Sequence, residues 1–94
     1  MPTYDFTDGF RRDLDHLNDA QRRALRRAVA HFVADLKAGQ FRARLRVKGV
    51  QSMPGTFEMT WADDGRALFT YGPEVRPGEP HVVWLAVGTH DILP

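Results

Sequence analysis

The chain has 94 residues, 43% of them hydrophobic and 11% aromatic, which is the composition of a folded globular protein and is long enough for a single domain over residues 1–94. It contains no cysteine and no run near the roughly 18 apolar residues that a membrane span needs, so disulfides, thiolate metal sites and membrane insertion are excluded, and we expect a cytoplasmic protein. The net charge of +1 does not by itself indicate a class of ligand, because the distribution of charge along the chain matters more than its sum.

Residues 3–6 predict a short first strand, after which Thr7 or Asp8 provides the N-cap of a helix. The apolar residues that follow recur at i, i+4 and i+7, the period of a one-sided helix: Phe10, Leu14 and Leu17. This first helix is therefore short and buries a single side.

A second helix is predicted to begin after Asn18, because Gln21 stands three residues later at the spacing of a capping box, and to end at Gly39. Its apolar stripe follows the 3.6-residue period: Leu25, Ala28, Val29, Phe32, Val33 and Leu36. Four arginines fall away from that stripe: Arg22, Arg23, Arg26 and Arg27. We expect an antiparallel helical hairpin whose second helix has a strongly basic side.

From Arg44 the period changes to two, which predicts a half-buried strand over residues 44–48. Leu45 and Val47 face the core in this pattern, while Arg44, Arg46 and Lys48 face the opposite way. These three cations are candidate contacts for phosphate groups.

Pro54-Gly55 indicates a turn before a strand over residues 57–61, in which Glu58 and Thr60 alternate with larger apolar side chains. Asp63-Asp64-Gly65 is a hairpin signal, and the return strand, residues 66–71, begins with Arg66 on the same polar side. We expect the polar side of this hairpin to be open to solvent.

Residues 72–80 hold three prolines and two glycines and predict a surface loop. The continuous apolar run His81 to Val87 then predicts a strand in the middle of the sheet, and Gly88 delivers His90 to the edge of that sheet. A titratable group on such rigid support is a candidate site residue.

The order of these elements predicts an α+β fold, in which the N-terminal strand and the helical hairpin pack on one face of a mainly antiparallel twisted sheet of four to five strands. Charge is divided unevenly over this fold. Residues 1–48 carry eleven Lys or Arg and six Asp or Glu, a net +5, whereas residues 49–94 carry two and six, a net −4. The basic half favours a phosphate-bearing ligand, although a charged helix surface is more often simply solvated.

Taken together, these features resemble the RelE/ParE family of type II toxin-antitoxin toxins over nearly the whole chain. The resemblance depends on the helical pair with its basic second helix, on the hairpin followed by Arg66, and on the ending Gly88-Thr89-His90-Asp91-Ile92-Leu93. That ending is similar to the Gly-Thr-His-x-x-Leu-Phe close of the RelE-like members that cut messenger RNA. Glu58 and Thr60 stand where some family nucleases have lysines.

The resemblance implies a metal-independent endoribonuclease that acts on mRNA at the ribosome, an mRNA interferase that inhibits translation, with no cofactor. In this scheme Arg66 contacts the scissile phosphate and His90 transfers a proton. Substrate phosphates would be held by Arg44, Arg46 and Lys48. No metal is expected, because no cluster of His and carboxylate residues has the spacing of metal ligands.

Structural roles compete with these assignments. His90 is also a candidate for a hydrogen-bonded turn histidine, and Arg66 for an arginine paired with Asp63 or Asp64 at the hairpin end. A ParE-like toxin that poisons DNA gyrase without catalysis, or an inactive relative that binds only an antitoxin, are the alternative functions. In every version the resemblance implies a cognate antitoxin partner, with which the chain forms an oligomer and whose acidic residues face the arginines of the second helix.

Overall fold

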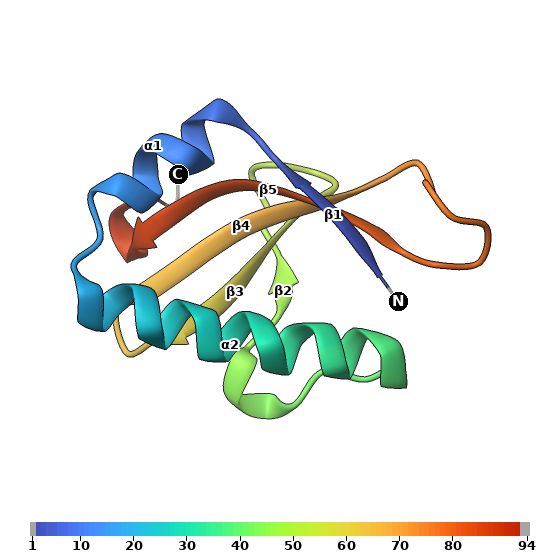
Figure 1. Ribbon diagram of the computed structural model, residues 1–94, viewed down its shortest axis with the longest axis horizontal. Helices are drawn as coiled ribbons and strands as arrows, with labels where there is room; N and C mark the ends of the chain where they lie inside the picture. Colours follow the sequence, from blue (N-terminus) through green and yellow to red (C-terminus); the bar gives the residue numbers. More distant parts are fainter. Residues whose placement is uncertain (1, 93–94) are drawn as a thin grey trace.

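A computed structural model describes residues 2–92, and for His90 it describes the backbone and not the side chain. The domain has an α+β architecture with two helices and one five-stranded sheet (Figure 1), as the sequence predicted. In chain order the elements are β1 (Thr3–Phe6), α1 (Asp8–Asp15), α2 (Asp19–Ala38), the 3₁₀ turn η1 (Ala43–Leu45), β2 (Lys48–Gly49), β3 (Thr56–Ala62), β4 (Gly65–Gly72), β5 (His81–Thr89) and the 3₁₀ turn η2 (His90–Ile92).

The strands lie in the order β1-β5-β4-β3-β2. Strand β5 is therefore an interior strand, which its continuous apolar run predicted, and it pairs with β4 on one side and β1 on the other. The β1–β5 pair is parallel and the other pairs are antiparallel. The first and last strands of the chain thus lie side by side (Figure 1).

Both helices begin where the sequence signals predicted, and α2 ends there too, whereas α1 ends at Asp15, before Leu17 of its predicted apolar stripe. The Thr7 hydroxyl accepts a hydrogen bond from the N–H of Phe10 at 3.1 Å and starts α1. Asn18 and Gln21 form a reciprocal capping box, each bond 2.8 Å long, at the start of α2. Gly39 ends α2 in the left-handed conformation, with φ at 85°, where a side chain would be strained.

Each helix packs on its own part of the sheet and makes little contact with the other helix. Helix α1 lies against β5 and helix α2 against β3 (Figure 1). A polar contact connects the two helices: Nε and Nη2 of Arg22 in α2 both donate to the carbonyl oxygen of Leu14 in α1, at 3.2 and 3.0 Å. The two helices still cover one face of the sheet, because Phe10 of α1 and Phe32 of α2 both contact Trp84 of β5.

The core lies between these helices and the sheet and is rich in aromatic rings. Phe32 is almost fully buried, with its ring centroid 4.9 Å from that of Phe69 and 5.2 Å from that of Trp84. Met59 and Leu45 are equally inaccessible. Burying a side chain of this size stabilises the fold by about 1.5–3 kcal/mol, so this cluster is the main source of stability that positions the rest.

The predicted strand over residues 44–48 is wrong. The chain instead makes the turn η1, passes through Arg46 in the left-handed conformation (φ 47°, ψ 44°), and forms only the two-residue strand β2 at Lys48–Gly49. The inward residue of the pattern, Leu45, is buried as expected. A 3₁₀ turn followed by a reversal also places alternate residues inward, so five residues of period two do not distinguish it from a strand.

The second face of the sheet is less open than predicted. Glu58, expected in solvent, has a side chain only 8% exposed and forms an ion pair with Lys48, Nζ to Oε1 3.2 Å. Its cross-strand neighbour Leu68 is buried as well. This face therefore carries a small covered region beside its polar residues.

Candidate active site and flanking surfaces

Arg66 lies at the turn of the β3–β4 hairpin, where the main chain fixes its position. Its Nη1 donates to three backbone carbonyls, those of Gly65 at 2.9 Å, Asp63 at 3.3 Å and Ala62 at 3.4 Å. All three bonds use one nitrogen of the guanidinium, and the remaining donors, Nη2 and Nε, make no hydrogen bond to the described part of the chain. The side chain is held by the turn while part of its donor fork stays available to a ligand.

The turn itself is built tightly. Gly65 lies against the indole of Trp61 so closely that a Cβ at this position would meet two ring carbons at 2.5 Å. The indole N–H of Trp61 donates to the carbonyl of Arg66 at 2.9 Å. A buried ring and a glycine together therefore fix the backbone from which Arg66 projects.

The end of β5 lies directly beside this turn. In the β4–β5 register Arg66 pairs with Gly88 and Gly65 pairs with Thr89, so the backbone of His90 follows at the same end of the sheet. The role predicted for the His90 imidazole falls outside the described residues, because the description stops at its backbone. The sequence-predicted pair thus lies at one end of the sheet, with Arg66 in β4 and the backbone of His90 in η2, directly after β5.

Helix α1 secures this end of β5. A bulge in β5 shifts its register against β4 between Leu68 and Phe69. Opposite it, the Thr7 hydroxyl donates to the carbonyl of Leu85 at 3.0 Å, and the N–H of Val87 donates to Oδ2 of Asp13 at 3.1 Å. These bonds satisfy the β5 edge that β1 is too short to cover.

Arg44 and Arg46, two of the predicted phosphate contacts, line a pocket of about 470 Å³ between α2, η1 and the end of β3. Two further basic residues line it from α2, Arg27 and His31. We call this cavity the arginine pocket, and its lining residues are Ala24, Arg27, Ala28, His31, Arg44, Leu45, Arg46, Thr60, Trp61, Ala62 and Asp63. The sequence did not indicate that Arg27 and His31 belong with η1, although their i, i+4 spacing does place them on one side of α2.

An ion pair between the nearly buried carboxylate of Asp35 and the exposed side chain of Arg42 fixes the chain just before η1. The carboxylate of Asp35 accepts from the backbone N–H of Arg42 at 2.9 Å, from Nε at 2.8 Å and from Nη2 at 2.9 Å. The side-chain hydrogen bonds from Arg42, and then its backbone bond, lower the pKa of Asp35 from 3.8 to about 2. The same contact raises the pKa of Arg42. Helix α2 and the segment that carries Arg44 and Arg46 are joined here.

Lys48, the third predicted phosphate contact, does not line the arginine pocket. Its ammonium pairs with the carboxylate of Glu58, so its positive charge is balanced within the protein. The structure therefore brings together two of the three cations that the sequence placed on one strand.

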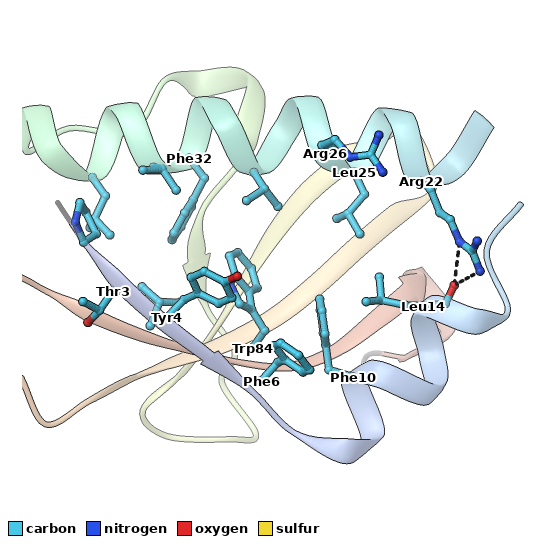
Figure 2. Close-up of a pocket in the computed structure, with 15 residues that line it drawn as sticks. Thr3, Tyr4, Phe6, Phe10, Leu14, Arg22, Leu25, Arg26, Phe32 and Trp84 are labelled. Atoms are coloured by element: carbon cyan, nitrogen blue, oxygen red, sulfur yellow. Dashed lines mark hydrogen bonds between the residues drawn. The ribbon is translucent and has the colours of Figure 1, made fainter. Parts of the chain in front are cut away.

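An apolar groove of about 460 Å³ lies on the other side of α2, facing β1 and α1 (Figure 2). Phe10, Leu25 and Trp84 point into it, and β1 contributes Tyr4 and Phe6 at its border (Figure 2). Tyr4 is 68% exposed and Phe6 39% exposed, which is unusual for side chains of this size. Arg22 and Arg26 line the groove along α2. We call it the apolar groove.

The basic side predicted for α2 is thus divided between two surfaces. Arg22 and Arg26 line the apolar groove, whereas Arg27 lines the arginine pocket. Within residues 2–92, no three His, Asp or Glu side chains gather in a way that could hold a metal ion. In the same part of the chain no helix combines the length and the apolar character that crossing a membrane requires.

Similarity to known proteins is found in structure and not in sequence. No protein-family model matches the chain, and no curated protein has a matching sequence. Among solved structures, YafQ from E. coli strain BL21(DE3) superposes with a TM-score of 0.65 at 14% identity, covering 99% of this chain and 98% of that one. The E. coli DinJ-YafQ complex matches with a TM-score of 0.63 at 13% identity, covering 99% and 98%. The RelB-RelE antitoxin-toxin complex of Methanococcus jannaschii matches with a TM-score of 0.62 at 13% identity, covering 96% and 99%.

These matches extend over the full length of each partner and show that the chain has the RelE/YafQ toxin fold. At such low identity they establish the fold alone. The function has to be argued from the residues of this chain.

Proposed function

We propose that this protein is the toxin of a type II toxin-antitoxin pair and cleaves mRNA on the ribosome in the cytoplasm. The observation that carries the proposal is the β4–β5 register, which sets Arg66 opposite Gly88 at the end of the sheet where the backbone of His90 follows two residues later. The RelE/YafQ fold supports it, since the compared structures include two antitoxin-toxin complexes.

Metal-free RNA cleavage needs a cation beside the phosphate, where negative charge builds up, and groups that move protons to and from the reacting oxygens. Arg66 supplies the cation: its Nη1 is engaged by the hairpin carbonyls, and Nη2 and Nε donate to two oxygens of the scissile phosphate. The guanidinium is already held before substrate arrives, so little entropy is lost on binding.

In this proposal the neutral imidazole of His90 accepts the proton of the 2′-hydroxyl as the 2′-oxygen attacks the phosphorus, and the resulting imidazolium returns that proton to the 5′-oxygen as the bond from phosphorus to the 5′-oxygen breaks. The attacking 2′-oxygen, the phosphorus and the leaving 5′-oxygen must be in line, and the ribosome provides that alignment by holding the mRNA. Positioning of this kind accounts for a large part of a barrier reduction, so a site with two principal groups is sufficient.

The antitoxin partner is proposed to occupy the apolar groove. The exposed rings of Tyr4 and Phe6 and the floor formed by Phe10 and Trp84 provide apolar anchors, and Arg26 provides a positive border. An amphipathic helix with an apolar stripe and acidic flanking residues fits both features. The apolar contact supplies most of the affinity, because a single exposed ion pair contributes only about 0–1 kcal/mol.

The test is inducible expression with growth measurement and primer extension on cellular mRNA. We expect growth arrest and new mRNA ends with the native chain, and loss of both with Arg66→Ala and with His90→Ala, each of which should reduce cleavage by about 100-fold or more. Arg76→Ala and His16→Ala are matched controls, because Arg76 lies in the exposed loop after β4 and His16 at the end of α1. Arrest without mRNA cleavage, accompanied by a block in DNA supercoiling, would exclude the nuclease in favour of gyrase poisoning.

A further inference from the structure

The arginine pocket gathers basic residues from two separate elements. Arg27 and His31 of α2 line it together with Arg44 of η1 and Arg46, which directly follows η1. Asp63 is the one carboxylate that lines it. All three arginines are exposed, so their charges are accessible to an anionic ligand from solvent.

The local structure directs these side chains to one place. Arg27 and His31 stand one turn apart on α2. The turn η1 brings Arg44 opposite them, and Arg46 follows in the left-handed conformation, which non-glycine residues seldom adopt outside functional or tightly determined sites. Because β2 is only two residues long, the last part of β3 has no partner strand on this side and forms the pocket wall instead.

The pocket is continuous with the position of Arg66. Thr60 lines the pocket and is the direct cross-strand partner of Arg66 on the same face of the sheet. Ala62 and Asp63 also line the pocket, and their carbonyls accept the hydrogen bonds of Arg66 Nη1. The hairpin end that holds Arg66 is therefore also part of the pocket wall.

We propose that the arginine pocket binds a second phosphate of the same RNA strand, one that flanks the phosphate held at Arg66, and so forms a separate nucleotide subsite. This inference rests on the proposed function and adds to it a binding site with its own residues. A volume of about 470 Å³ lies within the roughly 300–1,000 Å³ of small-ligand pockets and accommodates one nucleotide. Planar guanidinium groups match phosphate oxygens in pairs, and the small apolar residues Ala24 and Ala28 leave room beneath them.

An acidic protein segment is the other ligand that such charge attracts, and the observations favour RNA. Large exposed apolar anchors, which a protein partner needs, lie in the apolar groove on the other side of α2. The arginine pocket instead adjoins Arg66 through Thr60 and the hairpin turn.

The experiment measures binding apart from cleavage. A fluorescent single-stranded 2′-O-methyl RNA has no 2′-hydroxyl proton to remove and stays intact, so its anisotropy gives a dissociation constant at each salt concentration. Each phosphate contact on a single strand contributes about −0.7 to the slope of log K against log salt. The Arg27→Gln/Arg44→Gln variant removes the contacts to that one phosphate, so it should reduce the magnitude of the slope by about 0.7 and weaken binding at low salt.

Arg12→Gln/Arg76→Gln is the matched control, because it removes the same charge from exposed positions outside the pocket. Circular dichroism checks that each variant is folded, and His31→Gln/Arg46→Gln tests the same cavity if the first variant unfolds. A control whose slope falls as much as that of the pocket variants would show general charge attraction and overturn the proposal. Retained RNA affinity with loss of affinity for an acidic antitoxin peptide would also overturn it.

Failure of this inference and failure of the proposed function give different results. If the native chain cleaves mRNA and the pocket variants bind RNA as the native chain does, the subsite is wrong and the nuclease stands. If the pocket variants lose affinity and the native chain never cleaves, the anion site stands and the nuclease is wrong. Arg66→Ala should abolish cleavage and lower the magnitude of the salt slope by about 0.7, the share of one contact.

Discussion

Replacing Gly65 by alanine tests whether the hairpin end that carries Arg66 is as tightly packed as the geometry requires. The added Cβ would come within 2.5 Å of two ring carbons of Trp61, far inside ordinary contact distance. The ring is buried and cannot simply swing into solvent. Either the indole or the backbone at residue 65 has to move.

The expected cost follows from two terms. Overpacking a filled site costs about 1–3 kcal/mol. Moving the indole also breaks its hydrogen bond to the Arg66 carbonyl, 2.9 Å long, which is worth about 0.5–1.5 kcal/mol. Together these lower the free energy of unfolding by about 1.5–4.5 kcal/mol, which leaves a domain of ordinary stability folded and lowers its melting temperature by about 6–36 °C.

Urea unfolding followed by far-UV circular dichroism measures this change. Gly49→Ala is the matched control, since a Cβ there meets nothing within 4 Å and its backbone dihedral is not in the left-handed region. In a Trp61→Leu background the cost of Gly65→Ala should fall, because the ring that it displaces is gone. An unfolding midpoint for Gly65→Ala equal to that of Gly49→Ala would refute the packing argument.

Three further substitutions test other parts of the fold. The pKa of Asp35 is about 2 in the folded chain and 3.8 as its ordinary value, so the unfolded state binds more protons, and the stabilisation from this carboxylate, complete above about pH 5, is lost as pH falls from about 4 to 2. Asp35→Asn should therefore lower the urea midpoint at pH 7 and flatten the dependence of that midpoint on pH between about 4 and 2. Asp15→Asn is the control and should keep the native pH profile. Asp13→Ala leaves a backbone N–H of β5 without its acceptor and should cost about 1–3 kcal/mol in urea unfolding, an effect whose absence would mean that water replaces the carboxylate fully. The double substitution Tyr4→Ser and Phe6→Ser removes two exposed rings, so it should change the urea midpoint little. It should weaken binding of the antitoxin at least tenfold in a pull-down titration. Unchanged binding would mean that the antitoxin occupies another surface.

The sequence predicted helices and strands correctly where interactions within a few residues determine the local structure. The capping box at Asn18 and the glycine at residue 39 set the ends of α2 because they satisfy backbone groups within a few residues. The apolar run after His81 indicated an interior strand because only a strand covered on both faces has no polar alternation.

The prediction failed where distant contacts decide the structure. Arg46 adopts a left-handed conformation because Leu45 is drawn into the core and Arg42 is bound by Asp35, and no feature of residues 44–48 reports those partners. Glu58 is buried because Lys48 lies across from it, a pairing that the period-two pattern does not contain. The arginine pocket was missed for the same reason, since it unites α2 with a turn whose existence the sequence did not indicate.

The parallel pairing of β1 with β5 has a consequence for how the protein is made. Thr3 lies beside His81, so the sheet joins segments that leave the ribosome 78 residues apart. A contact of such separation forms late and slowly, because a long loop must close before it yields any stabilisation. A nascent chain halted before residue 81 holds β1 without a neighbour and β4 with one unpaired edge, so an incomplete translation product cannot assemble the sheet end at which Arg66 of β4 pairs with Gly88 of β5. The two ends of the chain must therefore both be present before the sheet that holds Arg66 is complete.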